Sequence, residues 1–283
     1  MQAKPALFFE ASVRHLFLSS SSKLSVAEAR TLLRRCRRIV SLFVLPPFST
    51  GSLIREMTLT QMKKWADYLG DLFGCYDAID LSHPVFRSVT HIDISEQVRA
   101  GDTRICPGLV ALPALTHLCL NNDVPVAILR RMLDECAQLQ VLVNLWSHHV
   151  SGAAYHVASN PPVSDVRFVV VIFTNYWRDW EAGARGHTDF WAAADAFVAR
   201  KRRCDIAEKV YTLLPLCMAF IDPHQASSGA CVRHSLFTEL GVTSSALPTS
   251  NSRPHQLHLS RPSGLLLDGP SSCAEQLTLP ANR

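Results

Sequence analysis

The chain has 283 residues, of which 48% are hydrophobic and 18% are charged. This composition predicts a globular protein with a sizeable core and excludes a chain that is disordered throughout. The formal net charge of +4 is too small for this length to indicate binding to nucleic acid or to a membrane surface.

The N-terminal apolar stretch, residues 6–9, is followed by Glu10 and Arg14, which interrupt any signal-peptide core. The longest clean apolar runs, such as residues 169–173, are far shorter than the ~20 residues of a membrane-spanning helix. None of the nine cysteines forms a C-x-x-C pair, which is typical of reduced thiols in an intracellular protein. We therefore expect a soluble cytoplasmic or nuclear monomer that does not contact a membrane.

An apolar-x-x-apolar-x-apolar pattern recurs through the first 175 residues, at steps of 23 to 27 residues. This spacing falls within that of leucine-rich repeats. Alternate strand residues share one face, so the last two positions of each copy are expected to face a common core. The copies are Val13/Leu16/Leu18, Ile39/Leu42/Val44, Met62/Trp65/Asp67, Val89/Ile92/Ile94, Leu115/Leu118/Leu120, Leu139/Leu142/Asn144 and Val166/Val169/Val171.

Helices are predicted where the chain crosses between strands. Ser25–Glu28 has the sequence of a capping box, which predicts a helix with Val26, Ala29, Leu32, Leu33 and Cys36 on its buried face. Pro125 suits the first turn of a second helix, whose buried face would be Val126, Leu129, Leu133 and Cys136. Residues 46–57, 74–86 and 104–113 are expected to be short, irregular crossovers. Residues 61–73 could form an amphipathic helix, but a strand is preferred because it falls on the period.

The sequence divides into three regions. Residues 1–174 are predicted to form an α/β leucine-rich-repeat-like solenoid with a parallel sheet of about six to seven short strands. Residues 175–221 carry aromatic side chains at helical spacing, with Thr188 as a helix cap, and are expected to cover the last open face of the solenoid. Residues 222–283 contain six prolines and eleven serines, which predicts a disordered tail.

The sequence contains no G-x-S-x-G, glycine-rich phosphate loop, H-E-x-x-H or paired-cysteine motif. No catalytic residue, cofactor or metal is therefore predicted. The competing hypothesis is a metal-dependent or hydrolytic enzyme that uses His148, His149 and His156. Adjacent strand residues point to opposite faces, however, which makes His148 and His149 poor co-ligands. A third hypothesis is a degenerate gene product without a selected function.

Histidines precede the middle apolar residue in three of the copies, and Ser41 holds the matching position in a fourth. In a stacked sheet these side chains align on the face opposite the core, which we expect to be concave and exposed to solvent. Phe17 and Phe43 on that face would form an apolar anchor pair for a partner. The predicted partner-binding residues are His15, Phe17, Ser41, Phe43, His91, Asp93, His117 and Cys119.

Two basic runs, residues 34–38 and 200–203, each follow or end a predicted helix. Positive charge at that position offsets the helix dipole, and no aromatic residues are interleaved as in single-strand binding. Nucleic acid is therefore not the expected partner.

Residues 73–86 with 89–94, and residues 179–186 with 189–203, resemble the repeat region of mostly uncharacterised fungal F-box-like proteins. The resemblance covers roughly residues 1–205. In such families an F-box docks on the adaptor of a ubiquitin ligase, and the repeat region is thought to hold the substrate. The first copy of the repeat lies almost at the start of this chain, so no F-box is expected. The resemblance implies a non-catalytic protein-interaction module, the substrate-recognition region of a ubiquitin-ligase adaptor-like protein, with a protein partner of unknown identity.

Overall fold

The computed structural model describes residues 6–57, 61–75, 78–99, 105–207 and 210–213. Its strands form one parallel sheet in which every strand pairs with its neighbour in the sequence. The predicted tail, residues 222–283, lies outside the described residues. The strands are β1 (His15–Leu18), β2 (Ser41–Val44), β3 (Lys64–Asp67), β4 (His91–Ile94), β5 (His117–Asn121), β6 (Val141–Ser147), β7 (Phe168–Phe173) and the short β8 (Thr212–Leu213).

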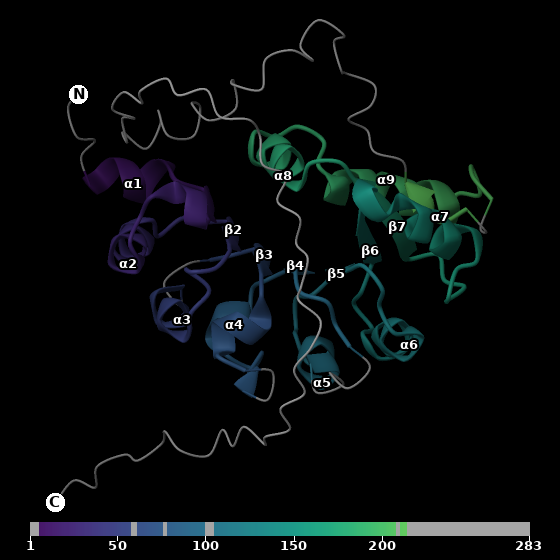
Figure 1. Cartoon of the computed structure of the whole chain (residues 1–283), viewed down its shortest axis with the longest axis horizontal. Coiled ribbons are helices and arrows are strands. Elements are labelled where there is room, and N and C mark those ends of the chain that lie inside the picture. The colour runs from purple at the N-terminus through teal and green to yellow at the C-terminus, as the bar shows by residue number, and fades with distance from the viewer. Residues whose placement is uncertain (1–5, 58–60, 76–77, 100–104, 208–209, 214–283) are drawn as a thin grey trace, which may run out of the picture. The chain divides into compact units, whose positions relative to one another are not determined.

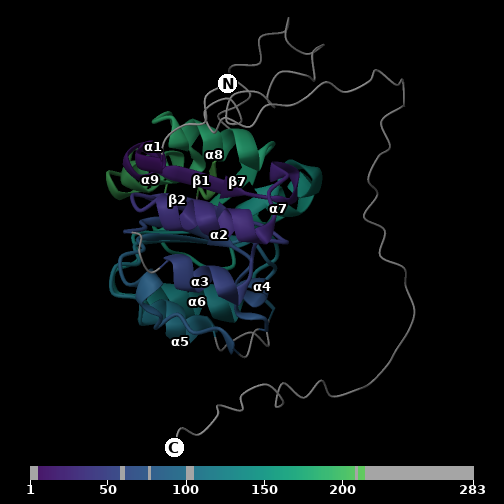
Figure 2. The same ribbon diagram turned by 90° about the vertical axis from the view of Figure 1, so that its left-hand side faces the viewer.

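Helices cover both faces of this α/β sheet. Figure 1 shows α2 to α6 on one side of the strands and α8 with α9 on the other, and Figure 2 shows the same separation for α8. The helices are α1 (Ala6–Ser12), α2 (Val26–Arg35), α3 (Gly51–Met57), α4 (Leu69–Phe73), α5 (Ile105–Val110), α6 (Val126–Glu135), α7 (Ser151–Ser159), α8 (Tyr176–Ala184) and α9 (Phe190–Arg202), with 3-10 turns η1 (Ser20–Ser22), η3 (Pro84–Phe86) and η4 (His148–Val150). No helix in the described part of the chain is long and apolar enough to cross a membrane.

The predicted strand positions and register are confirmed for the first six copies. Leu16 pairs with Leu42, Leu42 with Trp65, and the row continues to Leu142. The alternate residues of these strands that were expected to share a core are buried in one cluster with the helices α2 to α7. Periodic burial on this face therefore explains why the apolar pattern predicts the strands.

The seventh copy is wrong by one residue. Leu142 pairs with Phe168, and Phe168 and Val170 face the main core, whereas the predicted Val169 and Val171 face the opposite side. All residues of β7 from Phe168 to Ile172 are buried. A strand that is covered on both faces reads as a continuous apolar run, so its sequence carries no alternation to fix the register.

Two strands have a polar side chain where the repeat expects an apolar one, and both are buried. Ser49 Oγ donates a hydrogen bond to Asp67 Oδ1 at 2.6 Å, and Asn144 Nδ2 donates to the carbonyl of Asn122 at 2.6 Å. Asp67 therefore hydrogen-bonds to the segment that follows β2, and Asn144 to the segment that follows β5. These hydrogen bonds offset part of the free-energy cost of burying the two polar side chains.

Most local predictions hold, with three corrections. The Ser25–Glu28 capping box is formed, and residues 61–73 contain β3 followed by α4. The second predicted helix is α6, but Val126 does not belong to its buried face. Val126 is 39% exposed, and the buried residues of α6 are Ile128, Leu129, Met132 and Leu133. The crossovers expected to be irregular contain α3, η3 and α5. Asp189, not Thr188, caps α9, since its Oδ1 accepts from the Ala192 N–H at 2.8 Å.

Candidate functional site

The eight predicted binding residues lie on one face of the sheet and in two rows, as expected. His15 pairs with Ser41 and His91 with His117, while Phe17 pairs with Phe43 and Asp93 with Cys119. The register also adds Lys64, which lies between Ser41 and His91 in the first row. Parallel pairing of consecutive strands therefore brings together residues that are spread over more than one hundred positions of the sequence.

The expectation that this face is open to solvent is wrong. Helices α8 and α9 return across it and cover most of its side chains (Figure 1). The aromatic side of residues 175–203 does face inward, as predicted. It covers the face of the sheet that carries the predicted binding residues, and not only the last strand of the solenoid. His15, Phe17 and His91 remain partly exposed. The buried members are Ser41, Phe43, Asp93, His117 and Cys119.

An aromatic cluster joins β1 and β2 to α8. The rings of Phe17 and Trp177 lie 4.0 Å apart, those of Phe43 and Tyr176 5.1 Å apart, and those of Phe17 and Trp180 5.7 Å apart. Despite these contacts, 41% of the surface of Trp177 is exposed to solvent. Phe17 and Phe43, which were predicted to anchor a partner, therefore pack against α8 of the same chain. Trp177 is the solvent-exposed part of the cluster.

Asp93 is the polar centre beneath α8. Tyr176 Oη donates to Asp93 Oδ2 at 2.5 Å, and Asn121 Nδ2 donates to Oδ1 at 3.3 Å. Burial raises the pKa of Asp93 to about 6, although the hydrogen bonds from Tyr176, Cys119 and Asn121 oppose this shift. The carboxyl therefore links β4 and β5 to α8 and changes its charge near neutral pH.

The two central histidines lie beneath Trp191 of α9, whose ring is edge-on to both. The hydroxyls of Thr90 and Thr116 lie 2.8 and 2.7 Å from the Nδ1 atoms of His91 and His117, respectively. His117 Nε2 lies 2.8 Å from Asp195 Oδ1 of α9. Burial, and then the charge of His117, lowers the pKa of His91 to about 2, so His91 is neutral.

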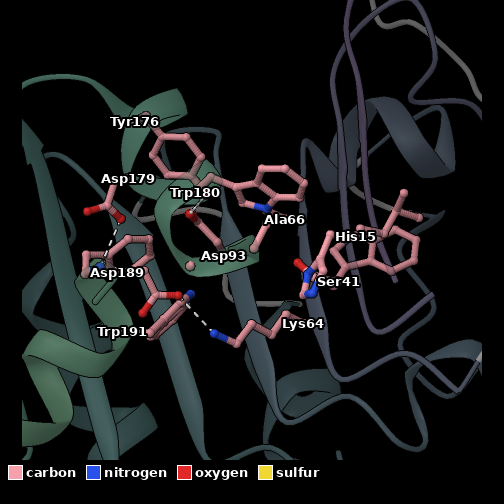
Figure 3. Close-up of a pocket in the computed structure, with 15 residues that line it drawn as sticks. His15, Ser41, Lys64, Ala66, Asp93, Tyr176, Asp179, Trp180, Asp189 and Trp191 are labelled. Atoms are coloured by element: carbon pink, nitrogen blue, oxygen red, sulfur yellow. Dashed lines mark hydrogen bonds and ion pairs between the residues drawn. The ribbon is translucent and has the colours of Figure 1, made fainter. Parts of the chain in front are cut away.

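A small pocket lies between the first strands and the two helices (Figure 3). Lys64 Nζ lies 3.0 Å from Asp189 Oδ2. Asp179 Oδ2 accepts a hydrogen bond from the Phe190 N–H at 2.9 Å, while burial raises its pKa to about 6. The charged groups of the pocket wall therefore already have partners within the chain, and the Lys64–Asp189 pair joins the sheet to the start of α9. His15, Ser41, Trp180 and Gly183 also line the pocket.

The histidines of the competing enzyme hypothesis lie elsewhere, on η4 and α7. The rings of His148 and His149 are 3.9 Å apart, because η4 is a 3-10 turn and not a strand. Both side chains and that of His156 are exposed. Among the residues that the structure describes, no group of three histidine, cysteine, aspartate or glutamate side chains is arranged to hold a metal ion.

Sequence reasoning missed the residues that α8 and α9 contribute to the covered face. These are Tyr176, Asp179, Asp189, Trp191 and Asp195. The spacing of the aromatic residues indicated a buried side, but no local signal showed which surface it covers. Lys64 could have been found, since it precedes the middle apolar residue of its copy as His91 does.

Comparisons with protein-family models, with curated proteins and with solved structures find no match to this chain.

Proposed function

We propose that the chain is a non-catalytic protein-interaction module built as a leucine-rich-repeat-like solenoid. The support is the regular order of the sheet, in which each strand pairs in parallel with the next one along the sequence. Units of this kind bury their faces against neighbours and offer extended surfaces to partners. The resemblance to F-box-like repeat regions points to recognition of a substrate for a ubiquitin ligase.

The accessible end of the aromatic cluster is the proposed contact surface. The observation that carries this assignment is Trp177, which is 41% exposed while its inner side packs on Phe17 and Phe43. Tryptophan is enriched among the side chains that dominate binding energy at interfaces, and its position here is fixed before a partner arrives. Phe17 and His15 are also partly exposed and extend the surface onto β1.

Affinity capture with the tagged full chain, followed by mass spectrometry, tests this proposal. The unmodified chain should recover a reproducible partner, and Trp177→Ala should reduce its recovery at least tenfold. Tyr155→Ala is the matched control, because Tyr155 is 47% exposed on α7, away from the cluster. Equal recovery with both variants would remove Trp177 from the interface. Recovery of ubiquitin-ligase subunits or of their substrates would support the ligase role.

A further inference from the structure

The amino-terminal edge of the sheet is lined with cations. All strands are parallel, so the segments that enter them lie at the same edge. The segments that enter the first four strands carry exposed cations and, among the residues described there, no acidic side chain. The basic edge comprises Arg14 before β1, Arg37 and Arg38 before β2, Lys63 before β3 and Arg87 before β4.

Backbone hydrogen bonds fix these segments side by side. The Val40 and Ser41 N–H groups donate to the Arg14 carbonyl at 2.7 and 3.1 Å. The Lys63 N–H donates to the Val40 carbonyl at 2.8 Å, and the Thr90 N–H donates to the Lys63 carbonyl at 2.9 Å. Neighbouring strands of a sheet are about 4.8 Å apart, so the cations form one continuous row.

The second basic run reaches the same edge from α9. Arg202 Nη2 donates to the carbonyl of Gln140 at 3.2 Å, and Gln140 immediately precedes β6. Arg200 and Arg203 are exposed beside it. The two basic runs, which are more than 160 residues apart in the sequence, are therefore at one edge of the folded chain.

Most of this charge is not neutralised within the molecule. In the described part of the chain, ion pairs near this edge join Arg203 to Asp205, Arg167 to Asp165 and Lys64 to Asp189. No carboxylate among the described residues pairs with the four arginines of the basic edge or with Arg200. An offset of the dipole of an α-helix does not explain Arg87, because Arg87 follows only the 3-10 turn η3.

We infer that the basic edge binds an extended acidic segment of a protein partner. This inference rests on the proposed function, since it names the chemistry of the partner. From β1 to β6 the row spans about 24 Å, which matches about seven or eight residues of extended peptide. Arginine side chains bind carboxylates through two parallel hydrogen bonds, which favours such a ligand.

The geometry favours a peptide over nucleic acid. The aromatic side chains that are exposed in the described residues, Tyr155 and Trp177, lie outside the segments that enter the strands, so the edge offers no stacking platform for a single strand.

Fluorescence anisotropy with the purified full chain tests the inference. The probe is a labelled ten-residue peptide of alternating glutamate and serine. The triple variant Arg37→Gln, Arg38→Gln, Arg87→Gln should bind at least tenfold more weakly than the unmodified chain, because three exposed ion pairs are lost. The matched control is Lys23→Gln, Arg130→Gln, Arg178→Gln, which removes the same charge from exposed positions elsewhere and should bind within twofold of the unmodified chain.

A second variant, Arg200→Gln with Arg202→Gln, tests the α9 end of the row and should weaken binding by about threefold or more. Absence of peptide binding, or equal loss in the triple variant and its control, would overturn the inference. Tighter binding of a duplex or single-stranded oligonucleotide than of the peptide, lost in the triple variant, would also overturn it and assign the edge to nucleic acid. If partner capture depends on Trp177 and the peptide does not bind, this inference fails while the proposed function stands.

Discussion

His91 and His117 lie face to face on neighbouring strands, with ring centroids 4.0 Å apart and ring planes 5° apart. His91 is neutral because burial lowers its pKa to about 2. His117 instead reaches Asp195 on α9, a residue whose side chain is 49% exposed. The stacked pair thus connects the buried face of the sheet to solvent through one hydrogen bond that also holds α9 in place.

Asp195→Asn should weaken the attachment of α9 to the sheet. The variant keeps the size of the side chain but removes the charge that faces His117 Nε2. We expect the free energy of unfolding to fall by roughly 0.5–1 kcal/mol, since the contact is half-exposed. Urea denaturation measures the change, and Asp123→Asn, at an exposed position, is the control. Equal effects of the two substitutions would show that the hydrogen bond to His117 contributes nothing.

Asp93 should make the fold less stable as the pH rises. Burial raises its pKa from 3.8 to about 6 in the folded chain. The folded state therefore holds this proton more tightly than the unfolded state, and the stabilisation is full below about pH 4 and lost as the pH rises through 6. Asp93→Asn should remove about 2 kcal/mol of the difference in unfolding free energy between pH 4 and pH 7.

Urea denaturation at the two pH values checks this prediction, with Asp71→Asn on the exposed side of α4 as the control. An unchanged pH dependence in Asp93→Asn would mean that the carboxyl is not desolvated beneath Tyr176.

The strands could be predicted because the core face of the sheet leaves a regular apolar signal in the sequence. Leu16, Leu42, Trp65, Ile92 and Leu118 recur since each neighbours the next in one buried row. The signal fails at β7, where α9 buries the second face as well. At that strand only the pairing of Phe168 with Leu142 determines the register.

The covering of the opposite face could not be predicted from the sequence. Its row of histidines and Asp93 reads as an exposed polar strip, because polar strand residues usually face water. Their hydrogen-bond partners, Tyr176 and Asp195, are 83 and 78 residues further along the chain. Local patterns report that a helix has an apolar side, but the surface that it covers depends on the whole fold.

Helix α8 should open more readily than α9. None of its residues is fully buried, whereas α9 buries seven, including Phe190, Trp191 and Phe197. Local opening costs less free energy where less apolar surface must be exposed. Hydrogen–deuterium exchange with mass spectrometry should show amides of α8 exchanging at least tenfold faster than those of α9. Equal protection of the two helices would show that they open as one unit.

Gly183 is required for α8 and α9 to approach one another. A Cβ atom at this position would lie 2.4 Å from Asp189 Oδ2 and 2.8 Å from Asp189 Cβ. Gly183→Ala should therefore displace Asp189 from Lys64 and lower the free energy of unfolding by roughly 1–3 kcal/mol, although alanine is the better helix former. The control is Gly152→Ala in α7, where a Cβ meets nothing within 4 Å and the same substitution should stabilise the chain by about 0.5–1 kcal/mol. Thermal denaturation of both variants measures the difference. If Gly183→Ala also stabilised the chain, the close contact between the two helices would have to be absent in solution.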